Sequence, residues 1–123
     1  MLGLRHLALR VLDVRRSVEF YMKTLGMWVD WQPDEKNVYL TSGSDNLALH
    51  QSDAVPVGGR LDHFGFLVST PEEVDGWALR LAASGVELAE MPRSHRDGSR
   101  SLYFCDPDGN LIQILFHPHI VGR

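Results

Sequence analysis

The residues best suited to chemistry in this chain are two histidines in a repeated segment. The run LRHLALRV, which contains His6, returns as LDHFGFLV, which contains His63. Successive side chains of a strand point to opposite faces, so each histidine lies opposite the large apolar side chains and two positions before a small residue, Ala8 or Gly65. Imidazole is the commonest protein metal ligand. The repeat therefore indicates two half-sites facing one cavity.

The same alternation adds further polar side chains to this cavity face from the later strands. We expect the cavity wall to carry His6, Ala8, Arg10, Tyr39, Ala48, His50, His63, Gly65, Tyr103 and Gln113. Two imidazoles and an amide oxygen suit iron, manganese, nickel or zinc, so His6, His63 and Gln113 form a candidate metal site. A single strand histidine is more often simply hydrogen-bonded, and a tyrosine can serve packing alone. The repetition at matched positions is what favours ligation.

Each half of the chain shows the elements needed to position these residues. In the first half, Asp13 can cap a helix that ends at Gly26, and short strands follow near 27–31, 37–42 and 46–51. The expected apolar stripe of this helix comprises Val14, Val18, Met22 and Leu25.

The second half repeats the plan. A capping box at Thr70 with a following proline begins a helix that ends at Gly85, and strands follow near 86–89, 100–105 and 110–116. Its expected stripe comprises Val74, Trp77, Ala78 and Leu81. The order predicts an α+β fold of two βαβββ modules that form a concave, mostly antiparallel eight-stranded sheet. Residues 1–123 then form a single domain, with module one at 1–55 and module two at 58–118.

Composition narrows the function classes. The chain has 123 residues, 44% of them hydrophobic and 23% charged, with a formal net charge of -4. An acidic chain without a basic run is a poor partner for nucleic acid or an anionic membrane. No apolar stretch is long enough to span a bilayer, and a single cysteine, Cys105, cannot form an internal disulfide. We expect a cytoplasmic protein whose partner is a small molecule.

Several motifs carry a family resemblance over essentially the whole chain. The opening LRHLALRV, the helical RRSVEFY followed by LG, and the closing DPDGNLIQ resemble the vicinal oxygen chelate superfamily, which includes glyoxalase I, bleomycin-resistance proteins, fosfomycin-modifying transferases and extradiol dioxygenases. The stretch 95–110 most resembles the catalytic half of extradiol dioxygenases. The resemblance implies a divalent metal, Fe(II) or Mn(II), held by His6, His63 and the residue at position 113. It also implies an acid–base role for His50 and places His95 and Tyr103 near the substrate.

Two positions depart from the family pattern. Gln113 stands where the third ligand is usually glutamate, and a neutral amide binds a divalent ion more weakly and compensates less of its charge. Ala48 stands where glyoxalase I carries another carboxylate, which leaves His50 as the nearby base. Proton-shuttling glyoxalase chemistry is therefore disfavoured.

Two function classes follow from these residues. The first is a metal-dependent extradiol-type dioxygenase acting on a small catechol-like substrate, which His50, His95 and Tyr103 favour. The second is a metal-free binding protein of the bleomycin-resistance type, which Gln113 and Ala48 favour. A lyase or thiol transferase of the glyoxalase I or fosfomycin-resistance type is a further alternative. We favour the enzyme, and we expect a homodimer because an open sheet leaves strand edges and an apolar face to cover.

Overall fold

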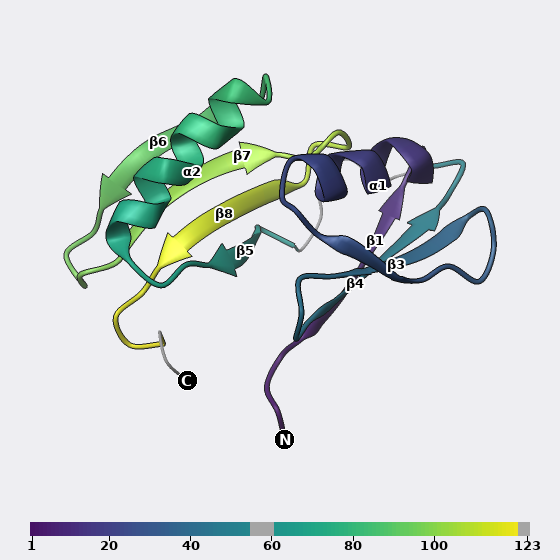
Figure 1. The fold of residues 1–123 in the computed structure, drawn as a ribbon, viewed down its shortest axis with the longest axis horizontal. Helices are drawn as coiled ribbons and strands as arrows, with labels where there is room; N and C mark the ends of the chain where they lie inside the picture. The colour runs from purple at the N-terminus through teal and green to yellow at the C-terminus, as the bar shows by residue number, and fades with distance from the viewer. Residues whose placement is uncertain (55–60, 121–123) are drawn as a thin grey trace. The chain divides into compact units, whose positions relative to one another are not determined.

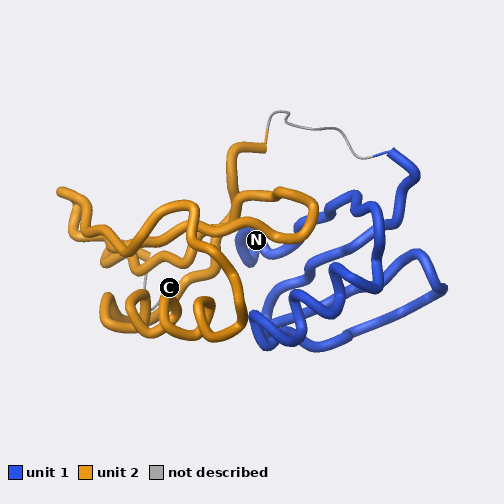
Figure 2. The backbone as a smooth tube through the Cα atoms, turned by 90° about the horizontal axis from the view of Figure 1, so that it is seen from above, with its two compact units in different colours: residues 1–57 blue, residues 58–123 orange. Residues whose placement is uncertain are grey.

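The computed structural model describes residues 1–54 and 61–120. The chain forms two compact units, residues 1–57 and 58–123 (Figure 2). Each unit is one βαβββ module (Figure 1), which confirms the predicted duplication. The expected module boundaries at 55 and 58 lie outside the described residues. None of the helices in the described ranges has the length and apolar character needed to cross a membrane.

Unit 1 contains a mixed four-stranded sheet with one helix packed against it. Its elements are β1 (His6–Val11), α1 (Val14–Lys23), β2 (Trp28–Trp31), β3 (Asn37–Thr41) and β4 (Asn46–Gln51). The strand order is β1-β4-β3-β2, with β1 parallel to β4 and the other pairs antiparallel. Helix α1 contacts β3 and β4. Leu9, Leu40 and Leu49 are buried in the core of the unit.

Helix α1 begins as predicted but buries a different face. The Asp13 carboxylate accepts a hydrogen bond from the Arg16 backbone N–H at 3.2 Å, which is the expected N-cap. The buried residues are Val14, Ser17 and Tyr21. The predicted stripe is therefore wrong beyond its first member: Val18 and Leu25 are half-buried and Met22 is exposed. The buried residues follow the i, i+3, i+7 spacing of one helix face. Two of them, a serine and a tyrosine, are not aliphatic, so a stripe defined by aliphatic residues does not include them.

Unit 2 has the same arrangement. Its elements are β5 (Phe64–Leu67), α2 (Pro71–Ala83), β6 (Leu88–Ser94), β7 (Arg100–Cys105) and β8 (Leu111–Phe116), in the strand order β5-β8-β7-β6. The Thr70–Glu73 capping box is present, as predicted. Val74 and Leu81 of the expected stripe are buried, whereas Trp77 and Ala78 are half-buried. Over the described residues, the strands thus form two sheets of four strands each.

Strand β6 lies later in the chain than the sequence suggests. It spans Leu88–Ser94 rather than 86–89, and it includes Pro92. Proline cannot donate to a strand ladder and is tolerated at the edge of a sheet. Strand β6 is the last strand in its sheet, and its pairing with β7 shifts register between Glu90 and Arg93. The edge position therefore explains why a proline-containing segment is still a strand.

Strand register shows how closely the two modules correspond. In unit 1, Ala48 pairs with Ala8 on one side and Tyr39 on the other. In unit 2, Gln113 pairs with Gly65 and Tyr103 in the same way. Gln113 and Ala48 therefore occupy equivalent positions. In each unit these residues alternate with the side chains that face the helix, and we call the face opposite the helix the open face.

Candidate functional site

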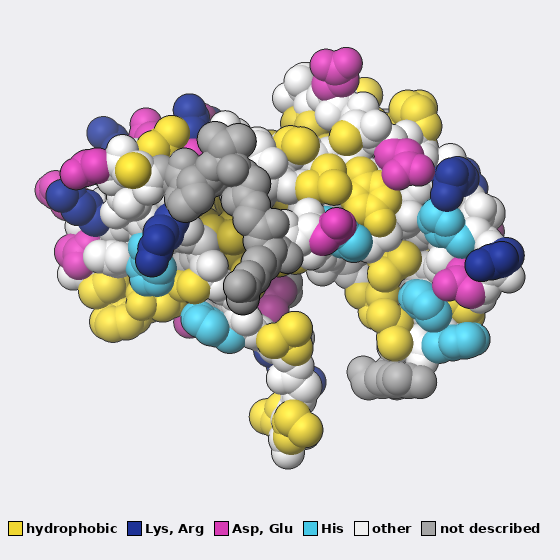
Figure 3. Space-filling view, turned by 180° about the vertical axis from the view of Figure 1, so that it is seen from behind, with side chains coloured by type: hydrophobic (Ala, Val, Ile, Leu, Met, Phe, Trp, Pro, Cys, Tyr) yellow, Lys and Arg dark blue, Asp and Glu magenta, His cyan; other side chains and the backbone are white. Residues whose placement is uncertain are grey.

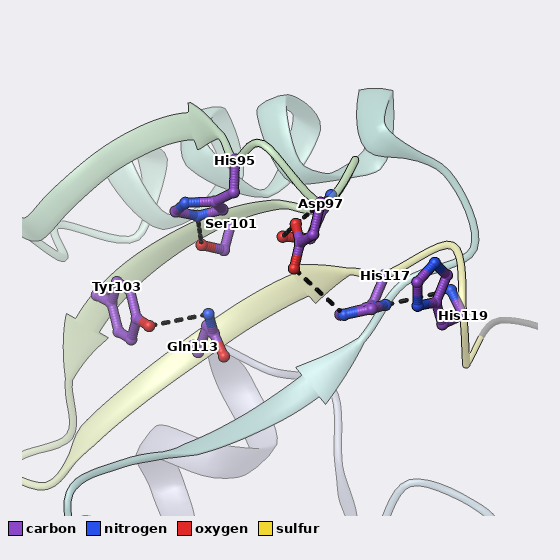
Figure 4. A network of polar contacts seen from close by, with 8 residues as sticks. His95, Asp97, Ser101, Tyr103, Gln113, His117 and His119 are labelled. Atoms are coloured by element: carbon purple, nitrogen blue, oxygen red, sulfur yellow. Dashed lines mark hydrogen bonds and ion pairs between the residues drawn. The ribbon is translucent and has the colours of Figure 1, made fainter.

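The open face of unit 2 brings a histidine, a glutamine and a tyrosine together. Gln113 donates a hydrogen bond from Nε2 to the Tyr103 hydroxyl at 2.9 Å, and the two side chains point toward one another (Figure 4). The His63 ring lies edge-on to the Tyr103 ring, with centroids 5.2 Å apart at 89°. The structure therefore places three of the predicted site residues side by side within one unit.

A carboxylate fixes the tautomer of His63. The Asp62 Oδ1 atom lies 2.6 Å from Nδ1 of His63. Because a carboxylate oxygen at neutral pH only accepts, Nδ1 carries the proton and Nε2 keeps its lone pair in the neutral ring. Metal-ligating histidines usually have such an acceptor behind them. Sequence reasoning missed this role for Asp62, although the residue directly precedes His63.

A missing side chain at position 65 leaves room beside Gln113. A Cβ atom on Gly65 would lie 3.3 Å from the Gln113 carbonyl oxygen and 3.5 Å from its Oε1. Tyr103 accepts from the Nε2 end of the amide, so Oε1 is the end that can coordinate a metal ion or accept a hydrogen bond. Gly65 thus keeps the space around this oxygen open.

Tyr103 is held in its protonated form. Burial raises the pKa of its hydroxyl above the ordinary value, and the negative charges of Glu90 and Asp62 raise it further, against a smaller opposing effect of Arg93. The hydroxyl oxygen accepts the Gln113 N–H, so its own proton is available to donate to a substrate oxygen. The site therefore offers a neutral hydrogen-bond donor at physiological pH.

His95 lies at the end of the same face, in the turn between β6 and β7. Its Nε2 is 2.9 Å from the Ser101 hydroxyl, and Ser101 is two positions before Tyr103 on β7 (Figure 4). An open pocket of about 640 Å³ lies here, lined by Arg93, Ser94, His95, Arg96 and Asp97. Asp97 contacts His117, with a carboxylate oxygen 3.5 Å from Nε2. Histidines are visible among apolar and charged side chains on this unit, at the right of Figure 3.

The open face of unit 1 carries the remaining predicted residues. His6 is exposed, and its Nδ1 lies 2.7 Å from Oδ1 of Asn46. The Tyr39 ring is edge-on to His50 at 5.8 Å and stacks on Trp31 at 5.2 Å. The predicted cavity residues of this unit are Ala8 and Arg10, both exposed, and Ala48, which is 1% exposed.

Each predicted set is thus assembled within its own unit, and the shared cavity stays a prediction. Within residues 1–54 and 61–120, no three His, Cys, Asp or Glu side chains gather closely enough to hold a metal ion. A metal site built on His63 therefore depends on the neutral oxygen of Gln113.

Comparison with known proteins identifies the family. Residues 3–114 match the Glyoxalase/Bleomycin resistance protein/Dioxygenase superfamily. The chain belongs to this superfamily. It is 34% identical to a trivalent organoarsenical cleaving enzyme of Bacillus sp. (strain MD1), over 90% of this chain and 71% of that protein. It is 30% identical to the glutathione transferase FosA of Serratia marcescens, over 91% and 79% of the two chains.

A solved structure supports the fold. The lactoylglutathione lyase of Agrobacterium tumefaciens superposes with a TM-score of 0.80 and 24% identity, covering 98% of this chain and 97% of that one. The match over residues 3–114 confirms the resemblance to the superfamily, and the solved structure confirms the fold. The named activities of these relatives are organoarsenical cleavage, glutathione transfer and a lyase reaction, rather than extradiol ring cleavage.

Proposed function

We propose that this superfamily member is a metal-dependent enzyme of the thiol-transferase or lyase type that acts on a small molecule. His63 and Gln113 of unit 2, together with His6 of unit 1, are the proposed ligands. The observation that carries the proposal is the Asp62–His63 pair, which leaves Nε2 with its lone pair on the same face as Gln113. The names of the relatives support this reaction class over ring cleavage.

The proposed ligand atoms, two imidazole nitrogens and one amide oxygen, fit a divalent ion that acts as a Lewis acid. Imidazole nitrogens and an amide oxygen suit Fe(II) or Mn(II). A bound ion would supply Lewis-acid polarisation of substrate oxygens. With three neutral ligands, the site keeps the full positive charge of the ion, which favours substrates that bring an anionic or strongly polar oxygen.

The chain's own residues orient the substrate and move protons. The Tyr103 hydroxyl, whose oxygen accepts from Gln113, can donate its own proton in a hydrogen bond to a substrate oxygen. His50 is the proposed group that accepts and returns a proton. His95, which is hydrogen-bonded to Ser101, lies at one end of the open face of unit 2.

A metal-free binding protein is the second candidate. The Trp31 ring is 58% exposed and stacks on Tyr39 with an interplanar angle of 26°, which gives a flat ring a surface to stack against. The hydrogen bond from Gln113 to Tyr103 also gives the amide of Gln113 a partner without any metal, which is compatible with a binding protein.

Metal titration of the 123-residue chain tests the proposal. Gln113→Glu should bind Mn(II) about tenfold more tightly than the parent chain, because a carboxylate compensates charge that an amide cannot, and tenfold is about 1.4 kcal/mol. His63→Ala should lose measurable binding. His119→Ala, which removes an exposed imidazole, is the matched control and should bind as the parent does. Equal or weaker binding by Gln113→Glu would show that the face is not a metal site.

Activity assays on the same variants then separate the reaction classes. The panel consists of glutathione addition, a lactoylglutathione reaction, a trivalent organoarsenical, and catechols in an oxygen electrode. His50→Ala should keep the metal affinity of the parent and lose turnover by about a hundredfold, the usual scale for a missing acid–base group. Oxygen uptake with catechols alone would support the dioxygenase instead. Ligand binding without metal or turnover would support the binding protein.

A further inference from the structure

His50 is the inner member of a chain of hydrogen bonds in unit 1. Its Nδ1 lies 2.6 Å from Oδ1 of Asn37. Asn37 in turn donates from Nδ2 to both carboxylate oxygens of Asp34, at 2.9 and 3.0 Å. An amide nitrogen only donates and a carboxylate only accepts. The Asp34 contact therefore orients the amide so that its oxygen faces the imidazole.

This orientation decides which nitrogen of His50 carries the proton. A carbonyl oxygen accepts and cannot donate, so Nδ1 of His50 must be the N–H. In the neutral ring, Nε2 then carries the lone pair. His6 and His63 each have one acceptor at Nδ1, whereas the acceptor of His50 is itself anchored by a charged group.

The local fold holds all three residues in place. Asn37 is the first residue of β3 and pairs with His50 of β4. Asp34 lies in the turn before β3, and its carboxylate also accepts the Lys36 backbone N–H at 2.8 Å. These hydrogen bonds, first from Lys36 and then from Asn37, lower the pKa of Asp34 below its ordinary value. The anchor therefore stays ionised at neutral pH.

We propose that Asp34 and Asn37 are positioning residues that hold His50 in the Nδ1–H tautomer and present Nε2 as the base of the reaction. In the step, the bond between a substrate atom and its proton breaks, its electron pair stays on the substrate, and the proton joins Nε2. The imidazolium keeps its Nδ1–H bond to Asn37, and the charge of Asp34 stabilises it through the amide. Arg10 pairs with His50 from β1. Its positive charge works against the positive charge of the imidazolium.

The catalytic part of the inference rests on the proposed function, whereas the tautomer can be measured without any substrate. Nitrogen-15 NMR of the imidazole rings in the full chain distinguishes Nδ1–H from Nε2–H. The parent should show His50 as Nδ1–H. Asn37→Ala should shift it toward Nε2–H, the form that free histidine favours. Asn37→Asp removes the N–H that Asp34 accepts but keeps an oxygen acceptor for His50. It should therefore keep Nδ1–H and raise the pKa of His50, since it adds a negative charge.

Asn46→Ala is the matched control, because Asn46 contacts His6 rather than His50. It should alter the His6 signals and leave those of His50 unchanged. If His50 is Nε2–H in the parent, or if Asn37→Ala leaves its tautomer unchanged, the inference is overturned. A failure of metal binding at His63 would overturn the proposed function while the tautomer result stands. In an active enzyme, Asn37→Asp should also move the acidic limb of the kcat/KM profile to higher pH.

Discussion

At the scale of single residues, the Nδ1 atoms of His6, His50 and His63 each lie within hydrogen-bond distance of an oxygen acceptor. His6, His50 and His63 could be predicted because strand alternation assigns a face to every residue. Asn37, Asn46 and Asp62 could not, because a short polar residue near a strand end is equally suited to a turn or to solvent. Their role depends on cross-strand register and rotamer, which the structure shows.

Gly65 offers a direct test of the space around Gln113. Gly65→Val should weaken metal binding by about tenfold or more, because even a Cβ atom would lie 3.3 Å from the Gln113 backbone and a branched side chain would crowd Oε1. Ala8→Val introduces the same side chain at the equivalent position of unit 1 and serves as the control. Mn(II) titration measures both. If Gly65→Val binds as tightly as the parent, the open space at position 65 has no part in the site.

At the scale of elements, order and type could be predicted, but some boundaries and faces could not. Capping residues and stop glycines marked both helices, and Gly26 and Gly85 have the positive φ that such a stop requires. The buried face of α1 was missed because it uses Ser17 and Tyr21. The extent of β6 was missed because Pro92 suggests a break, and only its edge position makes it acceptable.

Helix α2 is joined to its sheet by an ion pair whose contribution should depend on pH. Arg100 of β7 contacts both carboxylate oxygens of Asp75 at 2.6 and 3.1 Å, and it also donates to Ser94 of β6. Arg100 lowers the pKa of Asp75 in the folded state. The stabilisation is therefore present above the unfolded pKa and is lost as pH falls through the lower folded value.

Asp75→Asn should accordingly reduce the free energy of unfolding by at most about 1 kcal/mol at pH 7, since the Asp75 side chain is 52% exposed and solvent screens the pair. The difference from the parent should shrink toward zero near pH 2. Urea unfolding at both pH values measures it, and Asp53→Asn, at an exposed loop carboxylate, is the control. A deficit that stays constant with pH would point to lost packing instead of lost charge.

At the scale of the whole molecule, the duplication could be predicted in most detail. The duplication could be predicted because the repeat keeps residue types as well as periodicity. The strand pairing confirms it, since Ala48 pairs with Tyr39 as Gln113 pairs with Tyr103. The substrate could not be predicted, because the fold hosts many reactions and the relatives differ in theirs.

The expected homodimer also stays a prediction at this scale. Strand β2 ends the sheet of unit 1, and its Trp28 and Trp31 are 51% and 58% exposed. Large exposed aromatic side chains at a sheet edge favour association. Sedimentation velocity at micromolar concentration should give about twice the 13.9 kDa chain mass. Trp31→Ser should shift the distribution toward the monomer, with the exposed Leu79→Ser of α2 as the control. A parent chain that sediments at the single-chain mass would refute the dimer.

The proline in β6 has a consequence for the behaviour of the chain at high concentration. An outer strand with a continuous row of free N–H groups can template the growth of amyloid-like aggregates. Pro92 removes one donor from that row, and the charged Glu90 and Arg93 flank it. Pro92→Val would create a smoother seven-residue strand with higher β-propensity. We therefore expect the proline that makes this strand hard to recognise in the sequence also to lower the tendency of the protein to form fibrils.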